Sequence, residues 1–137
     1  MADIEELARV SIDFGLRIHK ELGPGLLESV YEAVLAEWLR RSGFMVERQR
    51  LLPIQFDGLT FAEGYRVDVL VDGKLIIEIK SCERLAPVHS KQLLTYIRLA
   101  RQPVGLLMNF GGDTFREGLK RIVNGPADII PLHRQKD

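Results

Sequence analysis

Residues 65–80 read YRVDVLVDGKLIIEIK, and they indicate the class of fold to expect. Two runs rich in Val, Ile and Leu, residues 65–71 and 75–80, flank Asp72-Gly73, a dipeptide typical of tight hairpin turns. The stretch therefore predicts two antiparallel strands joined by a short loop. Because this hairpin is mostly apolar, the acids and the lysine within it need a physical explanation.

Three ionisable residues of the hairpin, Asp68, Glu78 and Lys80, are the first candidates for chemistry. Alternation places Glu78 and Lys80 on one face of their strand and the apolar residues on the other. The position of Asp68 depends on the loop. A two-residue loop pairs Asp68 with Ile77 and separates the two acids across the sheet. A three-residue loop with a glycine bulge brings Asp68 onto the face of Glu78.

Two carboxylates and a lysine on one face are costly to bury unless they pair or bind a cation. Mg²⁺ takes oxygen ligands, commonly one or two carboxylates with several waters, and it acidifies the water that it binds. Lys80 would then orient or deprotonate that water. The alternative is a surface salt bridge between Glu78 and Lys80, which is the simpler interpretation of this short motif taken alone.

Apolar residues at helical spacing predict three helices around the hairpin. Gly23-Pro24 ends the first helix, Ser42-Gly43 ends the second, and Pro87 suits the first position of the third. The predicted helices cover residues 3–22, 25–41 and 87–101. The predicted strands cover residues 44–49, 51–56, 60–61, 65–71, 75–80 and 104–110. Residues 115–123 fit either a helix or a short strand pair, and Ile129-Ile130 fit an edge strand.

Glu28 is a candidate acid on the second predicted helix. At about 100° per residue its side chain projects between the directions of Leu35 and Leu39, at the border of the buried face. Glu32 and Glu37 point further away, and we interpret them as surface acids. A purely structural interpretation of Glu28 also stands, because an acid in the first turn is favourable to the helix dipole.

The third predicted helix carries His89, Gln92 and Tyr96 at i, i+3 and i+7, so these residues form one stripe. Leu93 and Ile97 are expected to face the core. Each polar residue has a structural interpretation when it is taken alone. Their joint order with a helix acid, a strand acid and Glu-x-Lys favours a shared site.

Residues 25–31, GLLESVY, have the form GxxExxY. Together with GYRVDVLV, IIEIKS, PVHSKQLLTYIRL and VGLLMNFG, this segment resembles the GxxExxY protein family, which is grouped with PD-(D/E)XK nuclease-like proteins. The similarity runs from about residue 12 to residue 124. It implies an α/β fold with a mixed central sheet flanked by helices, in the order helix, three or four strands, helix, strand. It also implies an active site on one side of the sheet.

The resemblance also implies roles for individual residues. Glu28 looks like the helix acid of the superfamily, Asp68 the first strand acid, and Glu78 with Lys80 the Glu-x-Lys pair. These three acids and the carbonyl of Ile79 would hold Mg²⁺ or Mn²⁺. Two residues of the following helix match the Q-x-x-x-Y element of the RecB-like branch, namely Gln92 and Tyr96.

The bulk composition bounds the function classes. With 137 residues and 46% hydrophobic residues, one domain with one core is expected. The single Cys82 excludes an internal disulfide, and neither a signal sequence nor an apolar stretch of roughly 18 to 20 residues is present. We therefore expect a cytoplasmic protein with no membrane partner. Nineteen Lys plus Arg balance nineteen Asp plus Glu, so attraction to a phosphate backbone must come from a local site.

These observations favour a metal-dependent nuclease that hydrolyses phosphodiester bonds in DNA or RNA. Lys80 would activate water, while Gln92 and Tyr96 would position the phosphate or the lysine. The alternative is a non-catalytic module with a nuclease fold that binds a protein partner or nucleic acid. The intact set of acids favours the first function, and the zero net charge favours the second. A homodimer would help either by doubling the contact surface.

Overall fold

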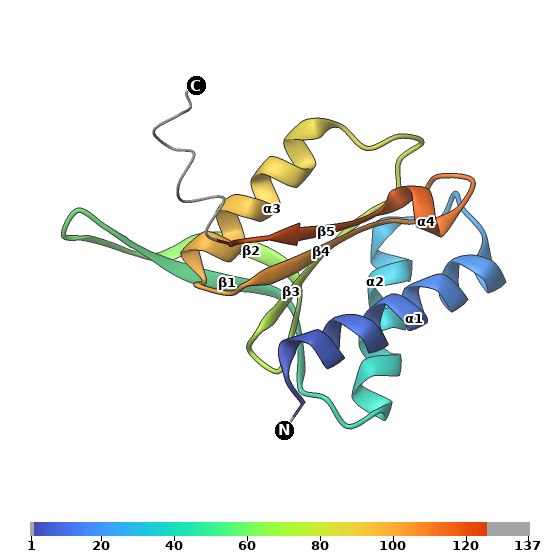
Figure 1. Ribbon diagram of the computed structural model, residues 1–137, viewed down its shortest axis with the longest axis horizontal. Helices are drawn as coiled ribbons and strands as arrows, with labels where there is room; N and C mark the ends of the chain where they lie inside the picture. The colour runs from blue at the N-terminus through green and yellow to red at the C-terminus, as the bar shows by residue number, and fades with distance from the viewer. Residues whose placement is uncertain (1, 126–137) are drawn as a thin grey trace.

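A computed structural model of the protein describes residues 2–125, which form a mixed β-sheet with helices on both faces (Figure 1). The strands stand in the order β1-β2-β3-β4-β5. Neighbours are antiparallel except β3 and β4, which are parallel because a helix crosses between them. This architecture confirms the predicted fold class. The strands are β1 (Val46–Phe56), β2 (Leu59–Val71), β3 (Leu75–Lys80), β4 (Val104–Asn109) and β5 (Leu119–Val123).

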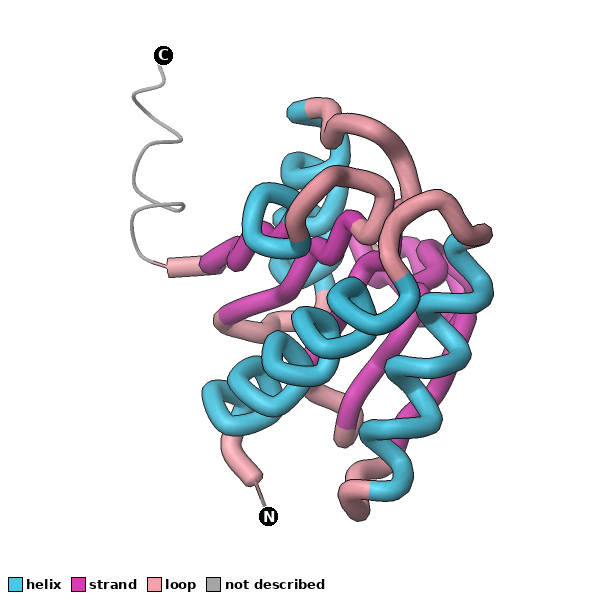
Figure 2. The backbone as a smooth tube through the Cα atoms, turned by 90° about the vertical axis from the view of Figure 1, so that its right-hand side faces the viewer, coloured by secondary structure: helices cyan, strands magenta, loops and turns pink. Residues whose placement is uncertain are grey.

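Two helices cover one face of the sheet and a third covers the other. α1 (Ile4–Leu22) and α2 (Glu28–Arg41) lie next to each other on one side, as Figure 2 shows. They pack in one core cluster with Leu75, Ile77 and Ile79 of β3. α3 (Pro87–Leu99) packs on the opposite face, in a second cluster that contains Ile76. Because alternate residues of β3 belong to different clusters, both faces of this strand are buried.

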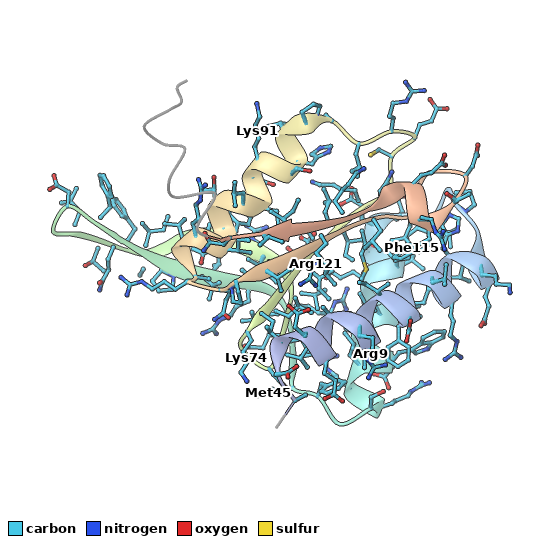
Figure 3. The ribbon with its side chains drawn as sticks, in the orientation of Figure 1. Arg9, Met45, Lys74, Lys91, Phe115 and Arg121 are labelled. Atoms are coloured by element: carbon cyan, nitrogen blue, oxygen red, sulfur yellow. The ribbon has the colours of Figure 1, made fainter. Side chains whose placement is uncertain are left out.

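A short helix, α4 (Phe115–Gly118), fixes the sheet against α1. The ring of Phe115 lies against Gly15 of α1, where a Cβ atom would come within 2.5 Å of the ring (Figure 3). The small residue in α1 is therefore required by this close approach.

The predicted helices are confirmed, with two boundaries corrected. α3 ends at Leu99 rather than near Arg101, which has a left-handed φ of +57°. α2 begins at Glu28 rather than near Gly25. Gly25 has a φ of +103°, which is left-handed and cannot belong to a helix. The hydroxyl of Tyr31 closes the preceding loop: it donates to the carbonyl of Gly23 at 2.6 Å and accepts from the N–H of Leu26 at 3.1 Å. Two of the three named positions of GxxExxY therefore shape this loop.

The predicted strands are also found, but some of them merge. Residues 44–49 and 51–56 contribute to the single strand β1, and residues 60–61 and 65–71 to β2. After α4 the chain forms β5, so the strand alternative holds for residues 119–123. Ile129-Ile130 lie outside the described residues. No helix within residues 2–125 is long and apolar enough to cross a membrane.

The ribbon formed by β1 and β2 turns over along its length. Val46 belongs to the core cluster under α1 and α2. Leu52 has the same parity in the strand, yet it packs against the cluster under α3. The partner strand shows the same change between Val69, which lies in the first cluster, and Val67, which lies in the second. Both strands therefore exchange faces at the same level.

The exchange of faces coincides with Gln49, which has a left-handed φ of +52°. This backbone conformation is uncommon for a residue with a side chain, and it interrupts the regular alternation of a strand. Further along the ribbon, residues 55–64 are all exposed and project from the body of the molecule, and we call them the arm (Figure 1). The functional candidates on β2 and β3 lie nearer the body, where the ribbon exchanges faces.

Candidate functional site

Asp68 and Glu78 lie opposite each other on neighbouring strands. The ladder between β2 and β3 pairs Val71 with Leu75 and Val69 with Ile77, and the same register sets Asp68 against Glu78. Three residues, 72–74, form the loop between the strands, so the structure adopts the three-residue alternative. The two acids are therefore on one face, as the metal-site hypothesis requires.

The two carboxylates take the place of ladder hydrogen bonds where the strands separate. The N–H of Asp68 donates to Oε2 of Glu78 at 3.0 Å. In the other direction, the N–H of Ile79 donates to Oδ2 of Asp68 at 2.8 Å. Each side chain thus satisfies a backbone donor of the opposite strand, which holds both carboxylates in fixed orientations.

Glu78 is buried with a large electrostatic penalty. Its exposed fraction is only 6%. Burial, and next the negative charge of Asp68, raise the pKa of Glu78 to about 8, against the smaller opposing effects of the Asp68 N–H and the Lys80 charge. Glu78 is therefore largely protonated at neutral pH without a cation. A bound divalent cation would favour the ionised form, so this carboxyl pair fits a metal chemically.

Lys80 shares the face of Glu78. Leu75, Ile77 and Ile79 lie in the cluster under α1 and α2, so alternation turns Glu78 and Lys80 toward the side of α3, as predicted. The charge of Lys80 acts to lower the pKa of Glu78, after the raising effects of burial and Asp68. Within residues 2–125, however, the Lys80 ammonium forms no ion pair with an acid within 4.0 Å. The salt-bridge alternative is therefore not observed among these residues.

α3 contributes Tyr96 to the surroundings of the acids. Burial raises the pKa of Tyr96, and the negative charges of Glu78 and Asp68 raise it further. Its ring lies 4.9 Å from that of Tyr65, which supports it from β2. Leu93 and Ile97 are fully buried on the core side of the same helix, as predicted.

The other two polar residues of the stripe on α3 behave differently from Tyr96. Gln92 is exposed. His89 accepts a hydrogen bond at 3.2 Å from the N–H of Ala86, at the beginning of its own helix. The structure therefore links Tyr96 electrostatically to the acids, while Gln92 remains a candidate on position alone.

The periodicity of the second helix predicted Glu28 at the border of the core, and this prediction is wrong. Glu28 is the first residue of α2 and is exposed. It lines an open cavity of about 680 Å³ together with Ser81 and Cys82, which directly follow Lys80 in the chain. Glu28 thus lies beside the end of β3, without a hydrogen bond to Asp68 or Glu78.

The interpretation of Glu32 as a surface acid is wrong. Glu32 is only 4% exposed and accepts hydrogen bonds from two residues of β1, Nε of Arg48 and Nε2 of Gln49, both at 2.9 Å. The same Nε2 of Gln49 lies 3.2 Å from Oδ1 of Asp68. One amide therefore connects the buried acid of α2 to the strand acid. Its helical spacing to Leu35 and Leu39, at i+3 and i+7, was the signal for burial.

Asn109, at the end of β4, was also missed by sequence reasoning. It is 2% exposed, and its Oδ1 accepts from the N–H groups of Cys82 at 3.0 Å and Gly111 at 3.1 Å. Its Nδ2 donates to the carbonyl of Cys82 at 2.9 Å. Asn109 therefore fixes the chain just after Lys80.

The described acids do not form a complete metal cage. Within residues 2–125, no three His, Cys, Asp or Glu residues are grouped so that they could hold a metal ion. The facing carboxylates of Asp68 and Glu78 are the two acidic ligands that the fold brings together. Since Mg²⁺ commonly binds through one or two carboxylates and keeps several waters, this pair fits such an ion.

Comparison with known proteins agrees with this arrangement. Residues 5–122 match the family model described as the PD-(D/E)XK nuclease superfamily. No curated protein matches the chain. The matched span contains Asp68, Glu78, Lys80 and Tyr96, and it covers every helix of the structure almost in full.

Proposed function

The chain belongs to the PD-(D/E)XK nuclease superfamily, and from this premise we propose that it is a metal-dependent nuclease acting on DNA or RNA. The observation that carries the proposal is the facing pair of Asp68 and Glu78, with a buried carboxyl whose pKa is raised to about 8. Such a pair is unfavourable without a cation.

In this proposal Asp68, Glu78 and the carbonyl of Ile79 hold Mg²⁺ or Mn²⁺. When bound, the ion would polarise a phosphoryl oxygen and acidify a water molecule. The facing carboxylates each retain lone pairs beyond those used by the backbone N–H groups, because an ionised carboxylate has about four acceptor sites. The hydrogen bonds to Asp68 N–H and Ile79 N–H therefore orient these ligands without exhausting them.

Glu28 is proposed as the additional acid on the helix side. In GLLESVY, Gly25 and Tyr31 have structural roles in the loop before α2, whereas the exposed Glu28 contributes only a first-turn charge that is favourable to the helix dipole. This division supports a functional role for the acid, and it supports the finer assignment to the GxxExxY family. Glu28 would act from the cavity beside Ser81.

Lys80 is proposed to orient or deprotonate the attacking water. Its ammonium shares the face of Glu78 and forms no ion pair with an acid within residues 2–125, so it is free to do so. An ammonium cannot ligate a metal ion, which separates its role from that of the acids. Gln92 and Tyr96 would position the phosphate or the lysine, since the charges of Asp68 and Glu78 reach Tyr96.

A non-catalytic binding module is the second candidate. It is favoured by the lack of a three-residue metal cluster within residues 2–125 and by the zero net charge of the chain. A protein of this kind would bind a protein partner or nucleic acid through the same fold. Its binding would be indifferent to metal ions, which distinguishes the two candidates.

The test is cleavage of a mixed panel of single-stranded, duplex and branched DNA and RNA by the purified chain with Mn²⁺. We expect cleavage of at least one substrate, lost in Asp68→Asn. The matched control is Asp57→Asn in the exposed turn of the arm, where asparagine tolerates the left-handed φ of +53°. Substrate binding without cleavage, unchanged by Mn²⁺ and by Asp68→Asn, would support the binding module instead.

A further inference from the structure

We propose that Gln49 is a positioning residue that orients the Asp68 carboxylate by linking it to the buried Glu32. The inference rests on the metal-dependent function proposed above and adds a residue that neither the sequence motifs nor the superfamily assign. Gln49 itself would touch neither the metal nor the substrate. It would act through Asp68.

The geometry of the link is specific to an amide. Nε2 of Gln49 lies 2.9 Å from Oε1 of Glu32 and 3.2 Å from Oδ1 of Asp68. Both neighbours are carboxylate oxygens, so the side of the amide that faces them must be the NH₂ group, whose two protons serve two acceptors. An aliphatic side chain of the same length would leave both carboxylates without this donor.

Glu32, to which the Gln49 amide is hydrogen-bonded, is itself held in place. Glu32 is almost fully buried, and its second oxygen accepts from Nε of Arg48 at 2.9 Å. A buried, doubly hydrogen-bonded carboxylate on a long helix has little freedom to move. Gln49 is therefore held at one end by α2 while it contacts the strand acid at the other.

The backbone conformation of Gln49 also supports a functional role for this residue. Its φ of +52° is left-handed, and it lies where the β1–β2 ribbon exchanges faces. Residues held in such sparsely populated conformations cluster at functional sites, where the surrounding structure maintains them. Here the conformation places the amide in the gap between Glu32 and Asp68.

Asp68 is consequently held at both oxygens. Oδ1 accepts from Gln49, and Oδ2 accepts from the N–H of Ile79 at 2.8 Å. Partners behind a ligating carboxylate commonly change metal affinity by about 10- to 100-fold when they are removed. We expect an effect of this size from the loss of the Gln49 amide.

The experiment measures Mn²⁺ affinity of the full chain by isothermal titration calorimetry, without nucleic acid. Gln49→Leu removes the donor at similar size. Gln49→Asn keeps an amide and tolerates a left-handed φ, but it is one methylene too short to reach both acids. Both variants should bind Mn²⁺ about 10- to 100-fold more weakly than wild type. The matched control is Gln55→Leu, at an exposed position of the same strand, which should bind like wild type.

The outcomes separate this inference from the function on which it rests. If Asp68→Asn weakens Mn²⁺ binding and both Gln49 variants bind like wild type, the inference is overturned and the proposed function stands. A lower melting temperature with unchanged affinity would give Gln49 a structural role only, and would likewise overturn it. If wild type binds Mn²⁺ no better than Asp68→Asn, the metal site fails and the inference fails with it.

Discussion

The two halves of the β1–β2 ribbon have similar patterns and very different surroundings. In the inner half, Val69 and Val71 are fully buried under α1 and α2. In the arm, Phe56 is 73% exposed and Leu59 is 59% exposed. Both halves alternate residues suited to strands, so local propensity does not distinguish them. Burial depends on whether helices cover the ribbon, and the candidate site lies at the junction where the ribbon passes from the cluster under α1 and α2 to the cluster under α3.

This contrast assigns different roles to the two halves. The junction carries buried charge held by hydrogen bonds between Asp68 and β3, and there small changes should affect chemistry and stability together. The arm has few covering contacts, and there the same kinds of change should have small effects.

The largest expected effect is that of Lys80→Ala at the junction. Cleavage should fall by about 10²- to 10⁴-fold, because a group that activates water or stabilises phosphate charge is lost. Mn²⁺ affinity should stay near that of wild type, because the ammonium is not a ligand. Single-turnover cleavage rates and calorimetry measure the two quantities. Lys91→Ala, on the exposed side of α3 (Figure 3), is the control. Equal cleavage by Lys80→Ala and wild type would remove Lys80 from the mechanism.

The next effect is a pH dependence of stability without metal. The folded pKa of Glu78 is raised from 4.5 to about 8, so the folded state retains a proton that the unfolded state has lost between these values. This contribution is fully present below pH 4.5 and is lost as the pH rises to about 8. We expect the wild type to lose on the order of a few kcal/mol of stability across this window. Denaturant unfolding at several pH values measures it.

Glu78→Gln is the matched variant for the pH prediction. It cannot ionise, so its stability should lack this decline and should exceed that of wild type above pH 8 when metal is absent. Saturating Mn²⁺ should stabilise wild type there, because it binds only the folded state. If the unfolding free energies of wild type and Glu78→Gln changed with pH in parallel, the raised pKa of Glu78 would be contradicted.

The smallest expected effects compare truncations in the two halves. Val69→Ala removes two methyl groups from a fully buried position and should cost about 2 kcal/mol of unfolding free energy. Phe56→Ala removes a larger side chain from the arm and should cost less than about 0.5 kcal/mol. Urea denaturation of both variants measures the difference. A cost for Phe56→Ala as large as that for Val69→Ala would mean that the arm is covered in solution.

Much of the fold follows from local patterns. Helical spacing and Gly23-Pro24 located α1, and period-two alternation together with Asp72-Gly73 located the central hairpin. Alternation alone was enough to place Glu78 and Lys80 on one face of β3. The position of Asp68 was not determined in this way, because loops of two and three residues at the same dipeptide give opposite faces, and the difference is set by how β2 and β3 pair.

Two features of the site depend on tertiary structure. Glu28 is exposed because Tyr31 closes the preceding loop and delays the start of α2. Glu32 is buried because β1 passes over it and supplies Arg48 and Gln49 as partners. The spacing of Glu32 to Leu35 and Leu39 agrees with its burial, but its partners on β1 are 16 and 17 residues away in the sequence. The loop before Glu28 is closed by a side-chain hydroxyl, which helical periodicity does not indicate.

The amino-acid sequence specified which residues are available for chemistry, because residue type and strand parity are local properties. Tertiary packing specified which of them meet. The left-handed backbone at Gln49 shows the reason. Glutamine has no special preference for this conformation, so the local sequence does not predict it. The conformation persists because Glu32 on α2 and Asp68 on β2 hold the side chain from both sides, and these partners come together only when the sheet and helices have packed.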